Sequence, residues 1–277
     1  MGRLRSLAAV TLQHVRNGRP VAWCPEWMNL GNLLYVAEWA HEGRCSGEER
    51  FVLLHPSKEA PLTLFPRLRE QFFLAKEEVS FFDRRVMPWS GEEDRRGEHF
   101  DPPHLRRYIL DHLLPGSPVA SPPDDIEDDA IVVNVRRGDY FSVPEHRAAF
   151  GMDTETYSLE AVGALITDSG APSSIVVVSD DVDWCRDNLA SLSKHGDVRF
   201  RDGSLVDDLS AIVHAQRLVL PNSTFSYWGG YIGDELYRDR RVAAPWFFNR
   251  EAEGGRAWQL RSHWLSIDSI PGGWEVR

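Results

Sequence analysis

A short apolar segment that ends in two arginines and a glycine, residues 131–140 (IVVNVRRGDY), most constrains the fold of this chain. Its β-branched start predicts a strand buried on both faces, as in parallel sheets covered by helices. Arg136 and Arg137 then lie at the carboxyl end of the strand, where open α/β sheets bind ligands. A guanidinium group matches the oxygen geometry of phosphate. The segment therefore indicates an anion site, although two arginines at a strand end also pair with surface carboxylates.

Strands and helices alternate after this segment, which predicts a parallel, Rossmann-like sheet. The expected strands are residues 131–135, 175–178, 198–200, 218–220 and 241–244, and the expected helices are 154–166, 180–189, 205–216 and 227–232.

The first part of the chain shows the same pattern in weaker form. An apolar run at 20–24 predicts a strand, Gly31 and Asn32 predict a turn, and a helix is expected from Leu33 to Ala40. A further strand is expected at 51–54 and a further helix at 102–114. These elements indicate a second α/β domain.

A segment rich in proline and aspartate, from Pro115 to Asp129, separates the two regions. Few of its residues can contribute to a core, so we expect a linker or an exposed loop. We place the domain boundary there, with an N-terminal α/β domain at 1–125 and a C-terminal Rossmann-like domain at 126–277.

Charge and cysteine content exclude several classes of protein. A formal net charge of −11 disfavours a nucleic-acid binder, which needs a basic face. The three cysteines are scattered and lack metal-type spacing, which favours a reducing compartment and a cytoplasmic location. No apolar run is long enough to span a bilayer, and residues 1–18 predict an amphipathic helix rather than a signal peptide. Peripheral contact with a membrane is compatible with this composition.

A second anion site is predicted after the strand at 218–220. The sequence PNSTFS at 221–226 precedes a helix, and helix N-termini expose backbone N–H groups that bind anions. Ordinary capping of the helix by Ser223 or Thr224 is the alternative.

Asp181 and Asp183 form a D-x-D sequence, which in one class of sugar-nucleotide enzymes holds a divalent metal on the diphosphate. Carboxylates that directly follow a strand also cap the next helix and interact favourably with its dipole, and we favour this interpretation. The chain has no HExxH, P-loop, GxGxxG or GxSxG motif.

Three segments, in order, resemble the α-1,2-fucosyltransferases of glycosyltransferase family 11. They are VNVRRGDY at 133–140, VVSDDVDWC at 177–185 and DDLSAIVHAQRLVLPNSTFSYWGGYIG at 207–233. APWFFN at 244–249 resembles the family's next strand, and Gly31-Asn32 resembles its N-terminal G-N motif in weakened form. The resemblance implies a GT-B-like glycosyltransferase architecture of two Rossmann-like domains, with the acceptor on the N-terminal side and a GDP-sugar bound by the C-terminal domain.

The implied reaction is inverting transfer of fucose from GDP-fucose to a hydroxyl of a glycan acceptor, with O2 of a terminal galactose expected. No metal and no other cofactor is expected. Fixed cations must then neutralise the departing diphosphate, and cations aimed at the β-phosphate stabilise the transition state more than the ground state.

The resemblance also implies roles for individual residues. Arg136 would contact the β-phosphate, with Arg137 beside it. Asp208 would accept the N1–H and amino group of guanine, a pair of donors that adenine lacks. Asn134 stands where the family has histidine, which is expected to retune donor affinity. The substrate-binding residues are expected to be Gly31, Asn32, Asn134, Gly138, Asp139, Tyr140, Asp208, Asn222, Ser223, Thr224, Phe225 and Ser226.

Inversion normally requires a base on the side of the sugar opposite the leaving group. Glu145 is the leading candidate, His146 and Asp139 are alternatives, and a strongly dissociative reaction needs no strong base. Two other functions stay open. One is a GDP-sugar or glycan binding module with little turnover, and the other is a metal-dependent glycosyltransferase that uses Asp181 and Asp183.

Overall fold

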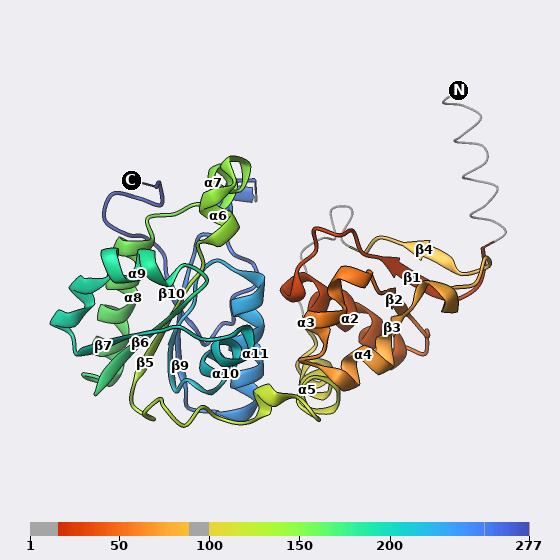
Figure 1. Cartoon of the computed structure of the whole chain (residues 1–277), viewed down its shortest axis with the longest axis horizontal. Helices are drawn as coiled ribbons and strands as arrows, with labels where there is room; N and C mark the ends of the chain where they lie inside the picture. The colour runs from red at the N-terminus through yellow and green to blue at the C-terminus, as the bar shows by residue number, and fades with distance from the viewer. Residues whose placement is uncertain (1–15, 89–99, 252, 277) are drawn as a thin grey trace. The chain divides into compact units, whose positions relative to one another are not determined.

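The chain divides into two compact units, Met1–Ser117 and Pro118–Arg277, in a computed structural model that describes residues 16–88, 100–251 and 253–276 (Figure 1). The division falls at the start of the segment in which the domain boundary was predicted. The helix predicted over 1–18 lies almost entirely outside the described residues. Within the described ranges, no helix is long and apolar enough to cross a bilayer.

The first unit contains a sheet of four parallel strands in the order β3-β2-β1-β4. The strands are β1 (Pro20–Trp23), β2 (Phe51–Leu53), β3 (Phe73–Leu74) and β4 (Arg84–Val86). The helices are α2 (Leu30–Cys45), α3 (Glu59–Leu62), α4 (Pro66–Phe72) and α5 (Pro102–Tyr108). Helix α5 continues as a π-helical segment, Ile109–Leu113. The strands predicted at 20–24 and 51–54 and the helix at 102–114 are confirmed, whereas β3 and β4 were not predicted.

Gly31 and Asn32 do not form a turn ahead of a helix, as the sequence had suggested. Helix α2 begins at Leu30 with Asn29 as its N-cap, so both residues lie in the first helical turn. The prediction was wrong because a Gly-Asn pair has the same local signature in a turn as near a helix end.

Three histidines lie together in the first unit. The ring of His41 is 5.2 Å from that of His112 and 6.4 Å from that of His104, between ring centroids. His41 is only 6% exposed, and its burial lowers its pKa to about 4, with the nearby His112 acting in the same direction. Burial also lowers the pKa of His112. His41 is therefore packed as a neutral ring at pH 7.

We expect the first unit to lose stability as the pH falls from about 6.5 towards 4, because His41 takes up a proton more readily in the unfolded chain than in the folded one. A shift of this size corresponds to a loss of up to about 3 kcal/mol. Urea denaturation at several pH values, compared between the protein and His41→Gln, measures this contribution. If both proteins lose the same free energy of unfolding between pH 7 and pH 4, His41 is not the cause.

The second unit contains a six-stranded sheet in the order β10-β9-β8-β5-β6-β7, and every neighbouring pair is parallel. The strands are β5 (Ile131–Val135), β6 (Ser174–Ser179), β7 (Asp197–Arg201), β8 (Arg217–Val219), β9 (Arg241–Pro245) and β10 (Leu265–Ile267). Read from β7, this is the 3-2-1-4-5-6 order of the dinucleotide-binding Rossmann fold. The predicted Rossmann-like sheet is confirmed, and β10 is the strand that sequence periodicity missed.

Helices cover both faces of this sheet. They are α6 (Gly138–Ser142), α7 (Pro144–Phe150), α8 (Thr154–Ser169), α9 (Val182–Asn188), α10 (Leu205–His214) and α11 (Thr224–Leu236). Helices α8 and α9 lie on one face, and α10 and α11 lie on the other (Figure 1). All five residues of β5 are buried, which explains its nearly continuous apolar sequence.

The growth of the sheet reverses direction beside β5. Strands β6 and β7 add on one side of β5, and β8, β9 and β10 add on the other. The carboxyl ends of β5 and β8 are therefore neighbours, and their connections leave towards opposite faces of the sheet. Such a reversal creates a crevice above the strand ends, where open α/β sheets bind their ligands.

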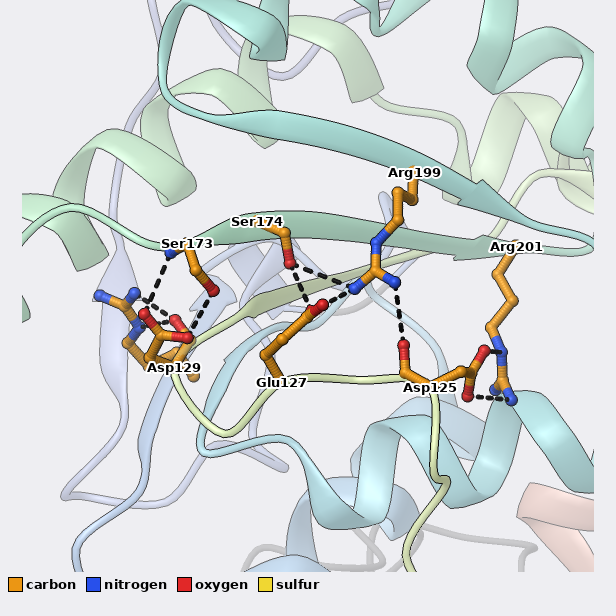
Figure 2. A network of polar contacts seen from close by, with 8 residues as sticks. Asp125, Glu127, Asp129, Ser173, Ser174, Arg199 and Arg201 are labelled. Carbon is orange, nitrogen blue, oxygen red and sulfur yellow. Dashed lines mark hydrogen bonds and ion pairs between the residues drawn. The ribbon is translucent and has the colours of Figure 1, made fainter.

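The acidic segment that precedes β5 is held to the sheet by polar contacts. Asp125 forms an ion pair with Arg201 at 3.0 Å, and Glu127 forms one with Arg199 on the same strand (Figure 2). Glu127 also accepts a hydrogen bond from Ser174 at 2.8 Å. A segment that cannot contribute to the core is thus fixed in place by its carboxylates.

Arg240 is a buried cation whose guanidinium holds the last turn of α10. Its side chain is 1% exposed, and it donates hydrogen bonds to the carbonyls of Ile212 at 2.9 Å and Val213 at 3.2 Å. Burial lowers its pKa to about 10, so it stays charged at neutral pH, and a cation is favourable at a helix C-terminus. The guanidinium occupies the space that a Cβ atom on Gly233 would need.

Candidate functional site

Two connections meet above the reversal point of the second sheet, one after β5 and one after β8. A hydrogen bond joins β5 to α11, because the hydroxyl of Ser226 donates to Oδ1 of Asn134. The amide of Asn134 in turn donates to the carbonyl of Val178 at 3.3 Å. Asn134 is 8% exposed and Ser226 is 1% exposed. Both side chains therefore fix the position of α11 relative to β5 and β6.

The N-terminus of α11 lies at this crevice. Ser223 is the N-cap residue, but its side chain makes no capping hydrogen bond. The first N–H groups of a helix have no intrahelical acceptor, and the helix dipole adds partial positive charge there. The structure therefore differs from simple capping by Ser223 and leaves Thr224 and Phe225 at an end that suits an anion.

Asn222 supports this end of α11 from below. Its amide group donates hydrogen bonds to the carbonyls of Phe150 at 2.9 Å and Phe248 at 2.7 Å, and the residue is 1% exposed. The sequence had suggested contact with substrate, whereas the structure uses Asn222 to hold three segments together.

Arg136 follows β5 directly and is held by two carboxylates. Its guanidinium forms ion pairs with Asp139 and, at 2.6 Å, with Asp180. The other oxygen of Asp180 accepts a hydrogen bond from the backbone N–H of Arg137 at 2.8 Å. The Arg136 side chain is 30% exposed, so these contacts fix its orientation without removing it from solvent.

Sequence reasoning missed the role of Asp180, although the strand order contains the signal. Val135 at the end of β5 is paired with Ser179 at the end of β6, so the residues that follow, Arg136 and Asp180, lie side by side. A Cβ atom on Gly138 would overlap the carboxylate of Asp180. Glycine is therefore required by this close approach.

The two adjacent arginines have different neighbours. The guanidinium of Arg137 lies between two aromatic rings, 3.7 Å from the centroid of Phe141 and 3.6 Å from that of Trp184. Its nearest carboxylate is Asp181, 3.6 Å from Nε, which is too long for a hydrogen bond. The structure therefore gives Arg137 surroundings of its own, which the expected place beside Arg136 did not anticipate.

The D-x-D carboxylates have other partners. Asp181 is the N-cap of α9 and accepts a hydrogen bond from the N–H of Trp184 at 3.3 Å. Asp183 is 89% exposed and pairs with Arg186 at 2.7 Å. The capping interpretation of Asp181 is confirmed. Across the described ranges, no group of three or more His, Cys, Asp or Glu side chains is placed to hold a metal ion.

The base candidates lie on α6 and α7. Glu145 is exposed in the first turn of α7. Asp139 lies on α6, where it contacts Arg136 and also lies 3.6 Å from Nδ1 of His146. Tyr140 stacks on Phe150 with ring centroids 4.6 Å apart, and burial raises its pKa, so it is a neutral phenol that shapes the site.

Asp208 presents a buried acceptor near the start of α10. Its Oδ1 has no hydrogen-bond donor among the described residues. Burial raises its pKa to about 6, and the lowering effect of Arg201 is smaller. A buried carboxylate oxygen without a donor is costly, so the donors of a bound ligand fit this position.

The remaining candidates, Gly31 and Asn32, lie on α2 of the first unit, whereas all the others lie in the second unit.

We expect Gly138→Ala to destabilise the second unit by about 1 to 3 kcal/mol, because the added methyl group must displace the Asp180 carboxylate. Gly163→Ala on α8 is the matched control, since a Cβ atom there meets no heavy atom within 4 Å. That control should be neutral or stabilising by up to about 1 kcal/mol. Thermal unfolding of the two variants tests the contact, and equal midpoints would contradict it.

A Rossmann-type sheet with a fixed guanidinium and a helix N-terminus at its reversal point defines the second unit as a nucleotide-binding type of α/β domain. Residues 124–238 match the model of glycosyl transferase family 11. This part of the chain is therefore similar to that family, and the resemblance seen in the three sequence segments is confirmed over this range.

Individual relatives match over part of the chain. The α-1,2-colitosyltransferase of Escherichia coli is 29% identical over 124 residues, which cover 44% of this chain and 42% of the relative. Galactoside α-(1,2)-fucosyltransferase 1 of Aotus azarae is 32% identical over 111 residues, which cover 38% of this chain and 30% of the relative. This chain thus spans less than half of each relative. The structure of E. coli heptosyltransferase WaaC with ADP aligns with 92% of this chain and 94% of its own, at 12% identity and a TM-score of 0.44.

Proposed function

We propose that this protein is an inverting glycosyltransferase that moves fucose from GDP-fucose to a hydroxyl of a glycan, with O2 of a terminal galactose as the acceptor atom. The observation that carries the proposal is the position of Arg136 and the N-terminus of α11 at the carboxyl ends of the two strands that flank the sheet reversal. The match of the same residues to the family model supports it.

Arg136 and α11 would bind the diphosphate of the donor. As the bond to the sugar breaks, negative charge grows on the β-phosphate, and donors that are already oriented need no reorganisation to stabilise it. Asp139 and Asp180 hold Arg136 in one orientation before any ligand binds. In this proposal the fixed cation and the helix N-terminus do the work of a metal ion, and no cofactor takes part.

Asp208 would read the guanine base. Its carboxylate, with two acceptor oxygens, can accept the N1–H and the amino group, which adenine does not offer together. Because the pKa of Asp208 is raised to about 6, the carboxylate is ionised at pH 7 and becomes protonated in mild acid.

The acceptor hydroxyl would lose its proton to a group on α7. Glu145 and His146 are the two candidates, and His146 has the Asp139 carboxylate beside it to hold its ring. Turnover is measured for Glu145→Gln and for His146→Gln, each with GDP binding shown to be intact. The variant that loses turnover identifies the base.

The acceptor is proposed to lie on the side of the first unit, where Gly31 and Asn32 belong to α2. One relative is named for transfer of a colitosyl group and another for transfer of a fucosyl group, so donor assays should include nucleotide-activated colitose as well as GDP-fucose. Cys45 and Cys185 are free thiols, in keeping with the proposed cytoplasmic location.

The direct test is GDP release from GDP-fucose, with and without a β-galactoside acceptor, in excess EDTA. We expect acceptor-stimulated release that Arg136→Gln lowers by about 100-fold or more, because it removes the charge that meets the β-phosphate. Arg186→Gln, an exposed arginine on α9, is the control and should retain full activity.

Other outcomes of this assay identify the rival functions. Activity that appears only with added manganese and is lost in Asp183→Asn would point to the metal-dependent enzyme. GDP binding without release for any acceptor or donor would favour a binding module.

We also expect GDP binding to weaken as the pH falls below about 6, since protonated Asp208 can no longer accept two hydrogen bonds. Asp208→Asn should lower the affinity for GDP by about 10- to 100-fold and should remove this pH dependence. Asp197→Asn, an exposed carboxylate at the start of β7, is the matched control. Calorimetric titration with GDP at pH 5, 6 and 7.5 measures the affinity of each variant, and an unchanged pH dependence in Asp208→Asn would rule out this role.

A further inference from the structure

A cavity of about 510 Å³ lies in the second unit, away from the residues proposed to bind the nucleotide. Its walls come from five places: Arg137 with the α6 ring of Phe141, Arg147 on α7, residues 152–156 at the start of α8, Trp184 and Asn188 on α9, and Val276. Arg136, Asp208 and the start of α11 do not line it. The volume is within the usual range of small-molecule sites.

One wall of the cavity is a guanidinium that the fold immobilises and pairs only loosely with a carboxylate. Arg137 is 12% exposed and is clamped between Phe141 and Trp184. Its Nε has no hydrogen-bond acceptor among the described residues, and its ion pair with Asp181, at 3.6 Å, is too long for a hydrogen bond. Asp181 also caps α9, and burial lowers the pKa of Arg137. Burying a cation is costly, so a second anion would add to the compensation that Asp181 provides.

A second cation faces the same ring. The guanidinium of Arg147 lies 5.9 Å from the centroid of Phe141, on which Arg137 also stacks. Over the part of the chain that the structure describes, the Arg147 side chain has no ion pair and no hydrogen bond. Two like charges on one ring repel each other, and an anion placed between them would turn this repulsion into two attractions.

The rest of the lining suits hydroxyl groups rather than a bare anion. Asp153 caps α8 by accepting from the N–H and the hydroxyl of Thr156, at 3.1 and 2.8 Å, and Glu155 is exposed beside it. The amide of Asn188 donates to the carbonyl of Trp184 at 2.8 Å, which leaves its oxygen as an acceptor. Carboxylate and amide oxygens would repel inorganic phosphate but would accept hydrogen bonds from sugar hydroxyls.

We infer that this cavity binds an anionic hexose, with its phosphate or carboxylate between Arg137 and Arg147 and its hydroxyls on Glu155 and Asn188. The inference does not depend on the proposed fucosyl transfer, since none of the residues assigned to the nucleotide lines the cavity.

The test is calorimetric titration of the whole protein with glucose 1-phosphate, glucuronate, glucose and inorganic phosphate. We expect one of the two anionic hexoses, or both, to bind at one site. Glucose 1-phosphate alone would indicate a sugar phosphate, and glucuronate alone would indicate an acidic sugar. Glucose and inorganic phosphate should each bind at least about tenfold more weakly than the preferred ligand, because each lacks one half of the contacts.

Two variants and one competitor locate the site. Arg147→Gln should weaken binding by about 10-fold or more, whereas Arg186→Gln on α9, outside the cavity, should leave it unchanged. Asn188→Leu should weaken the anionic hexose without changing the weak binding of phosphate. Saturating GDP should not displace the ligand. The inference is overturned if no anionic hexose binds, if glucose binds equally well, if GDP competes, or if Arg147→Gln binds like the parent protein.

Discussion

Asp180 is the residue whose contacts set the geometry of the turn after β5. From the end of β6 it holds the guanidinium of Arg136 and the backbone of Arg137, and its carboxylate fills the space above Gly138. One side chain thus sets the direction of a cation, the path of the chain after β5 and the start of α6. The positive charge at the strand end is usable only because a negative charge on the next strand fixes its position, which is a form of preorganisation.

The two arginines of this turn have different surroundings. Arg136 stays partly exposed near the N-terminus of α11, whereas Arg137 is clamped between aromatic rings on the side of α8 and α9. Arg137 is the N-cap residue of α6, where the chain leaves the extended conformation of β5. The sequence shows two neighbouring charges, and the backbone at this turn gives their guanidinium groups different surroundings.

Much of the fold of the second unit can be predicted from the sequence, because apolar strands alternate with segments of helical periodicity. The buried run at 131–135 and the alternation after it predict a parallel sheet, and the order of the strands then places Arg136 and the residues after β8 at one edge. The sequence could not show that Asn134 and Ser226 bind each other, or that Asn222 is used up by two backbone carbonyls, since these contacts join residues far apart in the chain. Strands β4 (RRV) and β10 (LSI) were missed because neither is a continuous apolar run. Strand β3 was missed because it begins at the C-cap residue of α4, with no turn between them.

The close packing of Arg240 against Gly233 has a consequence for how the sequence can change. The guanidinium that closes the end of α10 stands where any side chain at position 233 would begin. Loss of Arg240 would leave a void and would remove a donor from the carbonyls of Ile212 and Val213. It would not free position 233, because a Cβ atom there would also lie 2.4 Å from the backbone carbonyl oxygen of Val213. The arginine therefore depends on the glycine, whereas the glycine would be needed even without the arginine.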